Sequence, residues 1–374
     1  MNIGIDARAL TKKKAGIGTY CYKIIEYINK VDDKNNYFLF SNKKIVIDFK
    51  LKANWSICEG KSRIGTFWLY FKLPKTLKEN KIDVFWGTQH CLPKRNKYTK
   101  NIKYILTIHD IAIEKMKYIG SLYNTIIQKL ILKKSCKNAD RIIAVSKSTK
   151  KDLKELLEIE ENKIEVIYEG IEQKEQKKQL NKKIEEEIKD KYNIEDKDYI
   201  FFLSTIEPRK NLITAIKAYE RIREKNKSSN LKFIISGGKG WKTTETLNAI
   251  KNSKFAENII LTGYISNEEK EYFFKHCVAF VYPSLYEGFG IPVLEAMKNG
   301  AIVITSNISS LPEVGGNVAL YLNKLTDEEE LSNLIQKCIN LNEKERNEII
   351  KKGYENIKRF SWEDCANKTL KLLT

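Results

Sequence analysis

Short apolar runs alternate along the chain with longer stretches in which apolar residues recur at helical spacing. In the first half such runs stand at 3–5, 84–86, 104–106 and 142–145, and a further strand is expected at 163–171. Helices are predicted at 18–30, around Leu122, Ile126, Ile127 and Leu130, and from Ser148 onward with Leu153, Leu156 and Leu157 on one face. Strands that alternate with helices predict a parallel sheet with helices on both of its faces.

The same alternation begins again in the second half of the chain. Strands are expected at 199–203, 231–236, 259–261, 278–282 and 301–305, and helices at 211–224, at 268–274 and after a capping box at 326–329. Between the halves, residues 173–197 are almost wholly charged and polar, which predicts a junction with an exposed helix. We therefore expect one domain at 1–172, a second at 198–357, and a last helix at 358–374 that crosses back to the first.

Composition agrees with two soluble α/β domains. The 374 residues are 42% hydrophobic and 31% charged, which is ordinary for a globular protein of this length. We see no signal peptide and no apolar run near the roughly 18 residues of a spanning helix. The seven cysteines are scattered and form no CxxC pair, so no disulfide framework and no zinc site are indicated. A cytoplasmic location is expected.

The net charge of +19 has three interpretations. The excess is Lys rather than Arg, in a sequence rich in Lys, Asn and Ile, which suits a general compositional bias on solvated surfaces. Attraction to an anionic membrane is the second interpretation, since basic residues near such a surface are each stabilised by about 1 kcal/mol. Nucleic-acid binding is the third, and it ranks last because no named nucleic-acid module is present.

The clearest chemical motif runs from Tyr282 to Ala296. It leaves a strand, turns on two glycines and enters a helix whose first position suits Pro292. Such a junction aims backbone N–H groups and the positive helix end at a ligand above the sheet edge, which makes an anion site. Glu287 and Glu295 stand eight positions apart, and carboxylates here would accept hydrogen bonds from sugar hydroxyls. An ordinary turn with two surface acids is the alternative.

Two cations, Arg209 and Lys210, follow the first strand of the second half. They stand where a loop enters a helix, within reach of a ligand at the carboxyl edge of the sheet. A departing diphosphate gains negative charge, and a cation pair can stabilise it without a metal. We therefore expect neither a metal nor another cofactor. Asn211 is expected to cap the helix.

A glycine loop and two histidines complete the candidates in the first half. Gly16 and Gly18 stand after the first strand, but Tyr20 and Cys21 occupy the third-glycine region, which argues against a dinucleotide fingerprint and hydride transfer. His109 ends a strand, and Asp110 either orients its ring or starts the next loop. His90 also points to the carboxyl edge of the sheet, whereas His276 is expected to be structural.

These motifs together resemble a known family. Glu287 to Glu295, with Gly-Phe-Gly-Ile-Pro between, resembles the Glu-x7-Glu motif of the large retaining glycosyltransferase family called group 1 or family 4, and other segments agree in order over nearly the whole chain. The resemblance implies the GT-B fold: two Rossmann-like parallel-sheet domains facing a central cleft, with the acceptor mainly on the first and the donor mainly on the second. One departure is Gly315-Gly316-Asn317, where relatives often carry Gly-Asp.

The resemblance also implies roles for residues. Glu287 would hold the hydroxyls of the donor sugar, Arg209 and Lys210 would stabilise the departing diphosphate, and His109 would lie near the transferred sugar. The implied donor-binding set is Gly16, Gly18, Gly238, Tyr264, Ile265, Phe289, Gly290, Ile291 and Glu295, with Glu295 on the ribose. The implied acceptor-side set is Tyr20, His90 and Asp110.

Only the resemblance to known enzymes indicates which nucleotide sugar is the donor. The combination of Ile-His-Asp, Glu-Pro-Arg-Lys-Asn and Ser-Leu-Pro-Glu is similar to bacterial mannosyltransferases that use GDP-mannose for surface polysaccharide. UDP-glucose or another UDP-sugar is the alternative donor. The acceptor is expected to be a glycan or a lipid-linked sugar, which would place the protein at the inner face of the plasma membrane. A non-catalytic sugar-binding module and a basic nucleic-acid- or membrane-binding protein are the rival classes.

Overall fold

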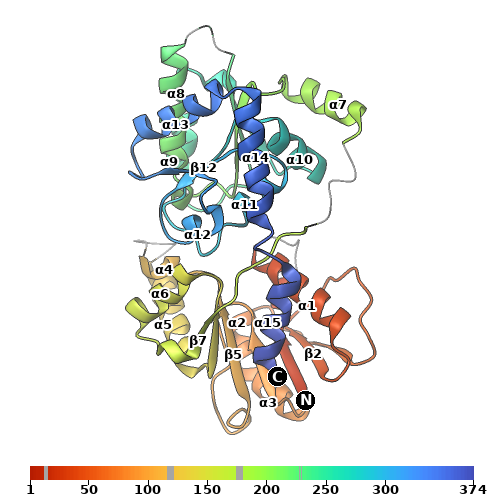
Figure 1. The fold of residues 1–374 in the computed structure, drawn as a ribbon. Coiled ribbons are helices and arrows are strands. Elements are labelled where there is room, and N and C mark those ends of the chain that lie inside the picture. The colour runs from red at the N-terminus through yellow and green to blue at the C-terminus, as the bar shows by residue number, and fades with distance from the viewer. Residues whose placement is uncertain (12–15, 116–121, 174–179, 227, 229) are drawn as a thin grey trace. The chain divides into compact units, whose positions relative to one another are not determined.

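The computed structural model describes residues 1–11, 16–115, 122–173, 180–226, 228 and 230–374. They form two compact units (Figure 1). Unit 1 comprises Met1–Gly170 and Phe360–Thr374, and unit 2 comprises Ile171–Arg359. The expected first domain ended at 172 and its returning helix began at 358. The charged segment expected as a junction carries a helix that belongs to unit 2.

Unit 1 is built on a parallel sheet of seven strands in the order β3-β2-β1-β4-β5-β6-β7. The strands are β1 (Asn2–Asp6), β2 (Asn36–Ser41), β3 (Trp55–Glu59), β4 (Val84–Gly87), β5 (Lys103–Ile108), β6 (Arg141–Ala144) and β7 (Ile164–Val166). Sequence analysis missed β2 and β3. The strand expected at 163–171 is shorter, and the residues after Val166 form a loop at the carboxyl edge.

Helices cover both faces of this sheet, as the alternating pattern predicted. The α-helices of unit 1 are α1 (Ile17–Val31), α2 (Gly65–Phe67), α3 (Leu73–Glu79), α4 (Ala112–Lys115), α5 (Leu122–Asn138), α6 (Lys147–Leu157) and α15 (Trp362–Leu373). A π-helical turn, η2 (Trp68–Lys72), joins α2 to α3, and two 3-10 helices are η1 (Arg8–Thr11) and η3 (Glu161–Lys163).

The two faces of the unit 1 sheet have separate cores. On one face, side chains of α3, α5 and α6 pack with Phe85 and Leu106 in a single buried cluster. Trp86, whose side chain points to the other face, lies 6.2 Å from Tyr20 of α1 between ring centroids. Tyr20 in turn lies 6.2 Å from Trp362 of α15. Helix α15 therefore packs beside α1 and completes unit 1.

Local details of two predicted helices differ from the pattern. Helix α6 begins at Lys147, one residue earlier than expected. Its N-cap is Ser146 rather than Ser148, and the Ser146 side chain accepts a hydrogen bond from the Thr149 N–H. In α6, Leu156 is exposed although Leu153 and Leu157 are buried. In α5, Ile126 and Leu130 are exposed, so the face predicted to be buried is wrong at these positions.

Unit 2 has a second parallel sheet, of six strands in the order β10-β9-β8-β11-β12-β13. The strands are β8 (Tyr199–Leu203), β9 (Lys232–Ser236), β10 (Ile259–Gly263), β11 (Phe280–Tyr282), β12 (Val303–Ser306) and β13 (Leu320–Leu322). The helices are α7 (Lys182–Tyr192), α8 (Leu212–Lys225), α9 (Thr244–Lys251), α10 (Asn267–His276), α11 (Ile291–Lys298), α12 (Leu311–Gly315), α13 (Glu328–Asn340), α14 (Glu343–Ile357) and the 3-10 helices η4 (Pro208–Lys210) and η5 (Ala256–Asn258).

Three sequence expectations need correction in unit 2. Helix α7 rests on α10 and buries Ile188, so the charged segment is not a free junction. Helix α13 starts from Asp327, whose carboxylate accepts from the N–H groups of Glu329 and Glu330, rather than from a capping box at Thr326. Pro292 occupies the second position of α11, not the first.

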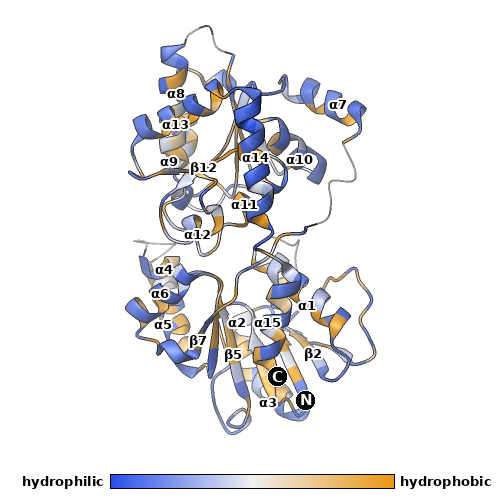
Figure 2. Cartoon of the chain, in the orientation of Figure 1, coloured by the Kyte–Doolittle hydropathy of each residue, from blue (hydrophilic) through white to orange (hydrophobic). Residues whose placement is uncertain are grey.

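The hydrophobic residues concentrate where the cores require them. Figure 2 shows strands such as β5 and β12 coloured as hydrophobic and most of the surface of α14 as hydrophilic. Among the helices of the described chain, none combines the length and apolar character needed to cross a bilayer.

Candidate functional site

The loops after β8 and β11 bring the main charged residues of unit 2 together. These strands are neighbours and run parallel, so their carboxyl ends meet at one edge of the sheet. The loop after β8 forms η4, which carries Arg209 and Lys210. The loop after β11 carries Glu287. A hydrogen bond of 2.8 Å from the Leu285 N–H to the Arg209 carbonyl ties the two loops directly.

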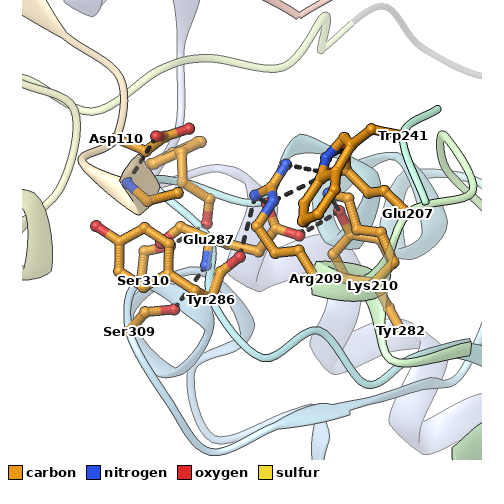
Figure 3. Close-up of polar contacts among 12 residues, drawn as sticks. Asp110, Glu207, Arg209, Lys210, Trp241, Tyr282, Tyr286, Glu287, Ser309 and Ser310 are labelled. Carbon is orange, nitrogen blue, oxygen red and sulfur yellow. Dashed lines mark hydrogen bonds and ion pairs between the residues drawn. The ribbon is translucent and has the colours of Figure 1, made fainter. Parts of the chain in front are cut away.

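Glu287 is the centre of this cluster. Its Oε1 accepts from Lys210 Nζ at 2.6 Å and from the Tyr282 hydroxyl at 2.8 Å, and its Oε2 accepts from Arg209 Nη1 at 3.0 Å. Lys210 Nζ also donates to the Tyr282 hydroxyl at 2.9 Å. Figure 3 shows Arg209 and Lys210 directed at Glu287 from the same side of the loop. Sequence analysis gave these residues separate contacts with the donor, and it missed that they bind one another.

Burial makes this network strongly charged. Burial alone would raise the pKa of Glu287, but the charges of Lys210 and Arg209 outweigh it and hold the pKa at about 2. Burial would lower the pKa of Lys210, yet the Glu287 carboxylate raises it. Burial and Glu287 raise the pKa of Tyr282 to about 12. At neutral pH the carboxylate and both cations are therefore ionised, and the phenol is neutral.

A second carboxylate, Glu207, balances the charge on Arg209. Its Oε1 accepts from Arg209 Nε at 3.0 Å, and its Oε2 accepts from the Trp241 indole N–H at 2.9 Å. Arg209 Nη1 also donates to the Tyr286 carbonyl at 3.0 Å. Glu207 and Trp241 were not among the predicted site residues. The Glu207-Pro208-Arg209-Lys210 motif contained a signal for the first, since it places an acid two residues before the Arg.

The Glu287 loop is fixed by serines that the sequence analysis did not assign to the site. The Ser309 hydroxyl accepts from the Glu287 N–H at 3.0 Å, and the Ser310 hydroxyl donates to the carbonyls of Glu287 and Phe289 at 3.0 and 2.6 Å. Gly290 is the N-cap of α11 with φ of 115°, a conformation that side-chain-bearing residues rarely adopt. In the sequence, Ser-Leu-Pro-Glu contributed only to the likeness to bacterial mannosyltransferases.

The other predicted donor residues of unit 2 lie at the same carboxyl edge or beside it. Tyr264 follows β10 and is 90% exposed, and its hydroxyl end lies over Gly238 after β9. Ile265 and Ile291 are half-buried, and Phe289 is buried. Gly237 has φ of 132°, and a Cβ there would stand 1.9 Å from the Ser204 carbonyl oxygen, so only glycine fits.

Two further predicted residues of unit 2 have partners that the sequence did not indicate. Glu295, expected to bind a ribose, forms an ion pair with Lys270 at 2.7 Å. Asn211 stands at the N-cap position of α8 without a side-chain cap. Its amide group instead donates to the Leu325 carbonyl at 2.6 Å, and its Oδ1 accepts from the Thr214 hydroxyl at 2.8 Å.

In unit 1, His109 lies at the carboxyl end of β5 with both ring nitrogens engaged. Nδ1 is 2.9 Å from Glu169 Oε1, and Nε2 is 3.1 Å from the Thr88 carbonyl oxygen. Both side chains of the His109–Glu169 pair are buried. Sequence analysis missed Glu169, because the loop after β7 had been taken as part of the strand. The pair shows that a carboxylate orients the ring, as expected, but from a different element.

Asp110 and His90 serve the backbone rather than the His109 ring. Asp110 Oδ1 accepts from the Ala112 N–H at 3.0 Å and so fixes the short loop between β5 and α4, in line with its expected place at the start of that loop. The His109 N–H donates to His90 Nε2 at 2.9 Å. Burial and the nearby charge of His109 lower the pKa of His90 to about 4, so His90 is neutral and accepts. His90 has φ of 61°, a strained conformation for a side-chain-bearing residue.

Tyr20 is placed below the candidate site rather than on its surface. The side chain is fully buried, and its ring packs edge-on against His109 with 4.7 Å between centroids. It therefore supports the histidine and has no surface with which to meet an acceptor. Gly16 is the N-cap of α1 and Gly18 lies in its first turn. Part of the glycine loop, including Ala15, lies outside the described residues.

An Asp-x-Asp triplet, the common signature of a metal-bound diphosphate, does occur in unit 2. Asp196-Lys197-Asp198 precedes β8 and so stands at the amino edge of the sheet, opposite the edge that carries Glu287. Asp196 is engaged by the Tyr272 hydroxyl at 3.0 Å and by His276 Nδ1 at 3.1 Å. Among the described residues, no group of three His, Cys, Asp or Glu side chains is arranged to hold a metal ion.

Comparisons with known proteins identify the family of both units. The family described as "Glycosyl transferases group 1" matches residues 183–356, and "Glycosyltransferase Family 4" matches residues 39–175. An uncharacterized glycosyltransferase of Methanocaldococcus jannaschii, MJ1178, is 30% identical over 74% of this chain and 70% of its own length. The O-antigen chain mannosyltransferase B of Escherichia coli is 33% identical over 48% of this chain and 46% of its own.

The match to the longer relatives is partial. The chain spans 46% of the length of that mannosyltransferase, and 32% of the serotype-specific mannosyltransferase WbdA of the same organism. Among solved structures, WaaG, a glycosyltransferase involved in lipopolysaccharide biosynthesis, superimposes with a TM-score of 0.75 at 13% identity over all of both chains. With its two Rossmann-like parallel sheets, the chain belongs to the group 1, family 4 glycosyltransferases of GT-B fold.

Proposed function

We propose that the chain is a retaining, metal-independent hexosyltransferase that takes its sugar from a nucleotide sugar, with GDP-mannose favoured. The acceptor is a glycan or a lipid-linked sugar in the synthesis of a surface polysaccharide or glycoconjugate. The observation that carries this proposal is the buried cluster of Glu287, Lys210 and Arg209 at the carboxyl edge of the unit 2 sheet. Ligands of open α/β sheets bind at this edge.

The cluster suits a group-transfer step with an anionic leaving group. When the bond from the anomeric carbon to the diphosphate breaks, negative charge grows on the diphosphate oxygens, and fixed cations nearby lower the energy of that state. A lysine has three N–H donors, and within the described chain Lys210 uses two of them, on Tyr282 and Glu287. The third donor is available to a phosphate oxygen. The acceptor hydroxyl forms the new bond, and its proton leaves with the diphosphate.

Glu287 has two roles in this proposal. It holds Arg209 and Lys210 in place, and the remaining lone pairs of its oxygens accept from hydroxyls of the donor sugar. Because Glu207 also neutralises part of the charge on Arg209, the free cluster has two carboxylates and two cations. Without a ligand, the charges of this cluster therefore cancel. A donor diphosphate adds its negative charge to the cluster and displaces neither Glu207 nor Glu287. Glu295 binds Lys270 through Oε1, and in this proposal its Oε2 accepts from the ribose hydroxyls.

The preference for mannose rests on those relatives that are named as mannosyltransferases, and the preference for GDP as the nucleotide rests on the sequence motifs alone. We place the reaction in the cytoplasm, at the inner face of the plasma membrane. All seven cysteines are free thiols in the described chain, which suits a reducing compartment.

The test is a thermal-shift screen with GDP, UDP, GDP-mannose, UDP-glucose and UDP-N-acetylglucosamine. A ligand at 100 times its Kd stabilises the folded protein by about 2.7 kcal/mol, which moves the unfolding midpoint measurably. We expect GDP and GDP-mannose to raise the midpoint. A shift with UDP compounds alone would select the other donor class, and no shift with any of them would contradict the transferase proposal.

Two further measurements test whether the reaction needs a metal and whether it retains the anomeric configuration. Transfer assayed with and without EDTA should proceed at the same rate if no metal takes part. The anomeric configuration of the product, read by proton NMR, should match that of the donor if the reaction is retaining.

A further inference from the structure

Four large apolar side chains are exposed to solvent on two helical segments of unit 1. On the segment formed by α2, η2 and α3, Phe67 is 50% exposed and Phe71 is 70% exposed. On α5, Ile126 is 50% exposed and Leu130 is 63% exposed. Each pair is separated by four residues and therefore lies on one side of its helix. The two phenyl rings also touch, with 4.8 Å between their centroids.

The two segments are neighbours on one face of the sheet. Leu73 and Leu77 of the first segment share a buried cluster with Leu132 and Cys136 of α5. The buried sides of both helices thus face the sheet and each other, which leaves their apolar pairs on the outer side.

The two pairs occupy corresponding positions along segments that run in the same direction. One segment joins β3 to β4 and the other joins β5 to β6 in a parallel sheet, so both run from its carboxyl edge to its amino edge. Phe71 and Leu130 each precede the last residue of their segment, Glu79 or Asn138, by eight positions. We define Phe67, Phe71, Ile126 and Leu130 as the apolar outer face of unit 1.

The two segments that carry this face are strongly basic. Residues 60–78 contain five cations and no Asp or Glu, and residues 122–138 contain four cations and no Asp or Glu. The exposed cations are Lys61, Arg63, Lys72, Lys75, Lys78, Lys133, Lys134 and Lys137. Glu79, the last residue of the first segment, is the one acid on the two segments. The excess of cations there is therefore much larger than the 67 basic and 48 acidic residues of the whole chain would give.

We propose that the apolar outer face docks on an anionic lipid bilayer. Aromatic and aliphatic side chains beside lysines are the chemistry of interfacial helices, whose apolar side enters the headgroup region while the cations meet the lipid phosphates. Long Lys side chains let the charge stay at the headgroups while their methylenes cover apolar surface. With Glu79 as the one acid on the two segments, anionic lipids meet little repulsion there.

This inference deepens the proposed function, on which it rests for its purpose. A lipid-linked acceptor is confined to the bilayer, and docking would bring unit 1 to the surface that holds it. The binding itself needs neither a donor nor turnover, so it can be measured separately.

The experiment is flotation of the purified protein with vesicles of phosphatidylcholine alone or of phosphatidylcholine with phosphatidylglycerol. We expect binding to the anionic vesicles only, and release as the ionic strength approaches about 1 M, where the Debye length falls to about 3 Å. Phe67→Ser/Phe71→Ser should weaken the binding at least tenfold, since about 1.4 kcal/mol corresponds to a factor of ten. Lys72→Glu/Lys133→Glu should weaken it by a similar factor.

Matched controls on unit 2 test whether a loss of vesicle binding is specific to the apolar outer face or follows from any change in charge or hydrophobicity. Lys344→Glu/Lys351→Glu makes the same charge change on exposed residues of α14, and Leu261→Ser/Ile339→Ser removes two exposed apolar side chains from unit 2. Both controls should bind vesicles within about twofold of the parent, a factor worth about 0.4 kcal/mol. Unfolding midpoints of all variants establish that each is folded.

The outcomes distinguish this proposal from the one on which it rests. Failure of the parent to bind anionic vesicles, or equal binding by the Phe67→Ser/Phe71→Ser variant, would overturn the docking face. A change from dimer to monomer in that variant, with vesicle binding unchanged, would assign the face to self-association instead. If a donor nucleotide raises the unfolding midpoint, the transferase proposal stands whatever the vesicle experiment shows. If no donor nucleotide raises it, only the transferase proposal is contradicted.

Discussion

Lys210 Nζ lies 2.6 Å from Glu287 Oε1, and both side chains are buried. A buried ion pair of this kind is costly to desolvate, and removal of one partner leaves an uncompensated charge inside the protein. Such an arrangement is therefore poorly explained by stability alone. It is explained by a need to hold a cation and a carboxylate at fixed positions beside a ligand.

Stability should fall in acid because of Glu287. Its pKa is about 2 in the folded protein and 4.5 is its ordinary value, so the carboxylate stabilises the fold fully above pH 4.5. This contribution, about 3 kcal/mol from a shift of about two and a half pH units, is lost as the pH falls from about 4.5 to about 2. Chemical unfolding of unit 2 at a series of pH values measures it.

Glu287→Gln should flatten that profile, because the amide does not titrate. Glu295→Gln is the matched control: it removes a carboxylate from a partly exposed ion pair and should keep most of the acid dependence. An equally steep loss of stability in Glu287→Gln would show that other groups control the acid transition.

Lys210→Met should destabilise unit 2 by about 3–5 kcal/mol, because Glu287 then remains buried with less compensation. The double variant Lys210→Met/Glu287→Gln should be less destabilised than Lys210→Met alone, since no net charge is left unpaired at that contact. Urea unfolding gives both values. Lys270→Met, which breaks a more exposed pair with Glu295, should cost about 1 kcal/mol or less. Additive effects of the two cluster substitutions would argue against direct coupling.

Replacement of Glu169 by Ala should reduce sugar transfer while donor binding persists. The carboxylate orients His109 through a 2.9 Å contact, and without it the ring loses one of its two fixed partners. We expect a fall in kcat of about tenfold to a hundredfold, which is at or below the roughly 10²–10⁴-fold that a group acting directly in proton transfer contributes. Glu169→Gln, which still offers an acceptor oxygen, should retain more activity. Steady-state kinetics with a thermal shift by the donor separates the two effects.

Gly290 and Gly353 should respond to alanine in opposite directions. Gly290 has φ of 115°, so Gly290→Ala forces a strained backbone at the start of α11 and should cost roughly 1–3 kcal/mol. Gly353 lies inside α14, and a Cβ there would meet Met297 Cβ at an ordinary 3.5 Å. Gly353→Ala should therefore stabilise by about 0.5–1 kcal/mol. Thermal unfolding of both variants tests the pair, and a stabilised Gly290→Ala would contradict the assigned loop strain.

The alternation of apolar runs was sufficient to predict two parallel α/β units, because buried parallel strands and their covering helices leave a periodic trace in one sequence. Strands toward the two ends of the unit 1 sheet were predicted least well: β3 and its six-residue neighbour β2 were missed, and the strand predicted at 163–171 pairs only at Ile164–Val166. The periodicity also failed at Ile126 and Leu130, because it reports that a helix has an apolar side but not what covers that side.

The candidate residues were predicted better than their partners. Glu287, Arg209 and Lys210 could be found because each follows a strand, and such ends converge at one sheet edge. That Glu287 binds both cations, or that Glu169 reaches His109 from sixty residues away, depends on side-chain positions that no spacing encodes. Tyr20 illustrates the reverse error, since a residue next to a glycine loop was taken for a ligand contact and proved to be core.

The division of the chain has a consequence for biosynthesis. Unit 2 is one continuous stretch, whereas unit 1 is interrupted after Gly170 and resumes at Phe360. During synthesis on the ribosome, unit 2 can therefore complete its sheet before α15 has been made. Until then, the side of α1 that packs against α15 remains uncovered. Unit 1 begins first and finishes last, so its nascent form is the stage at which chaperones and proteases have the longest access.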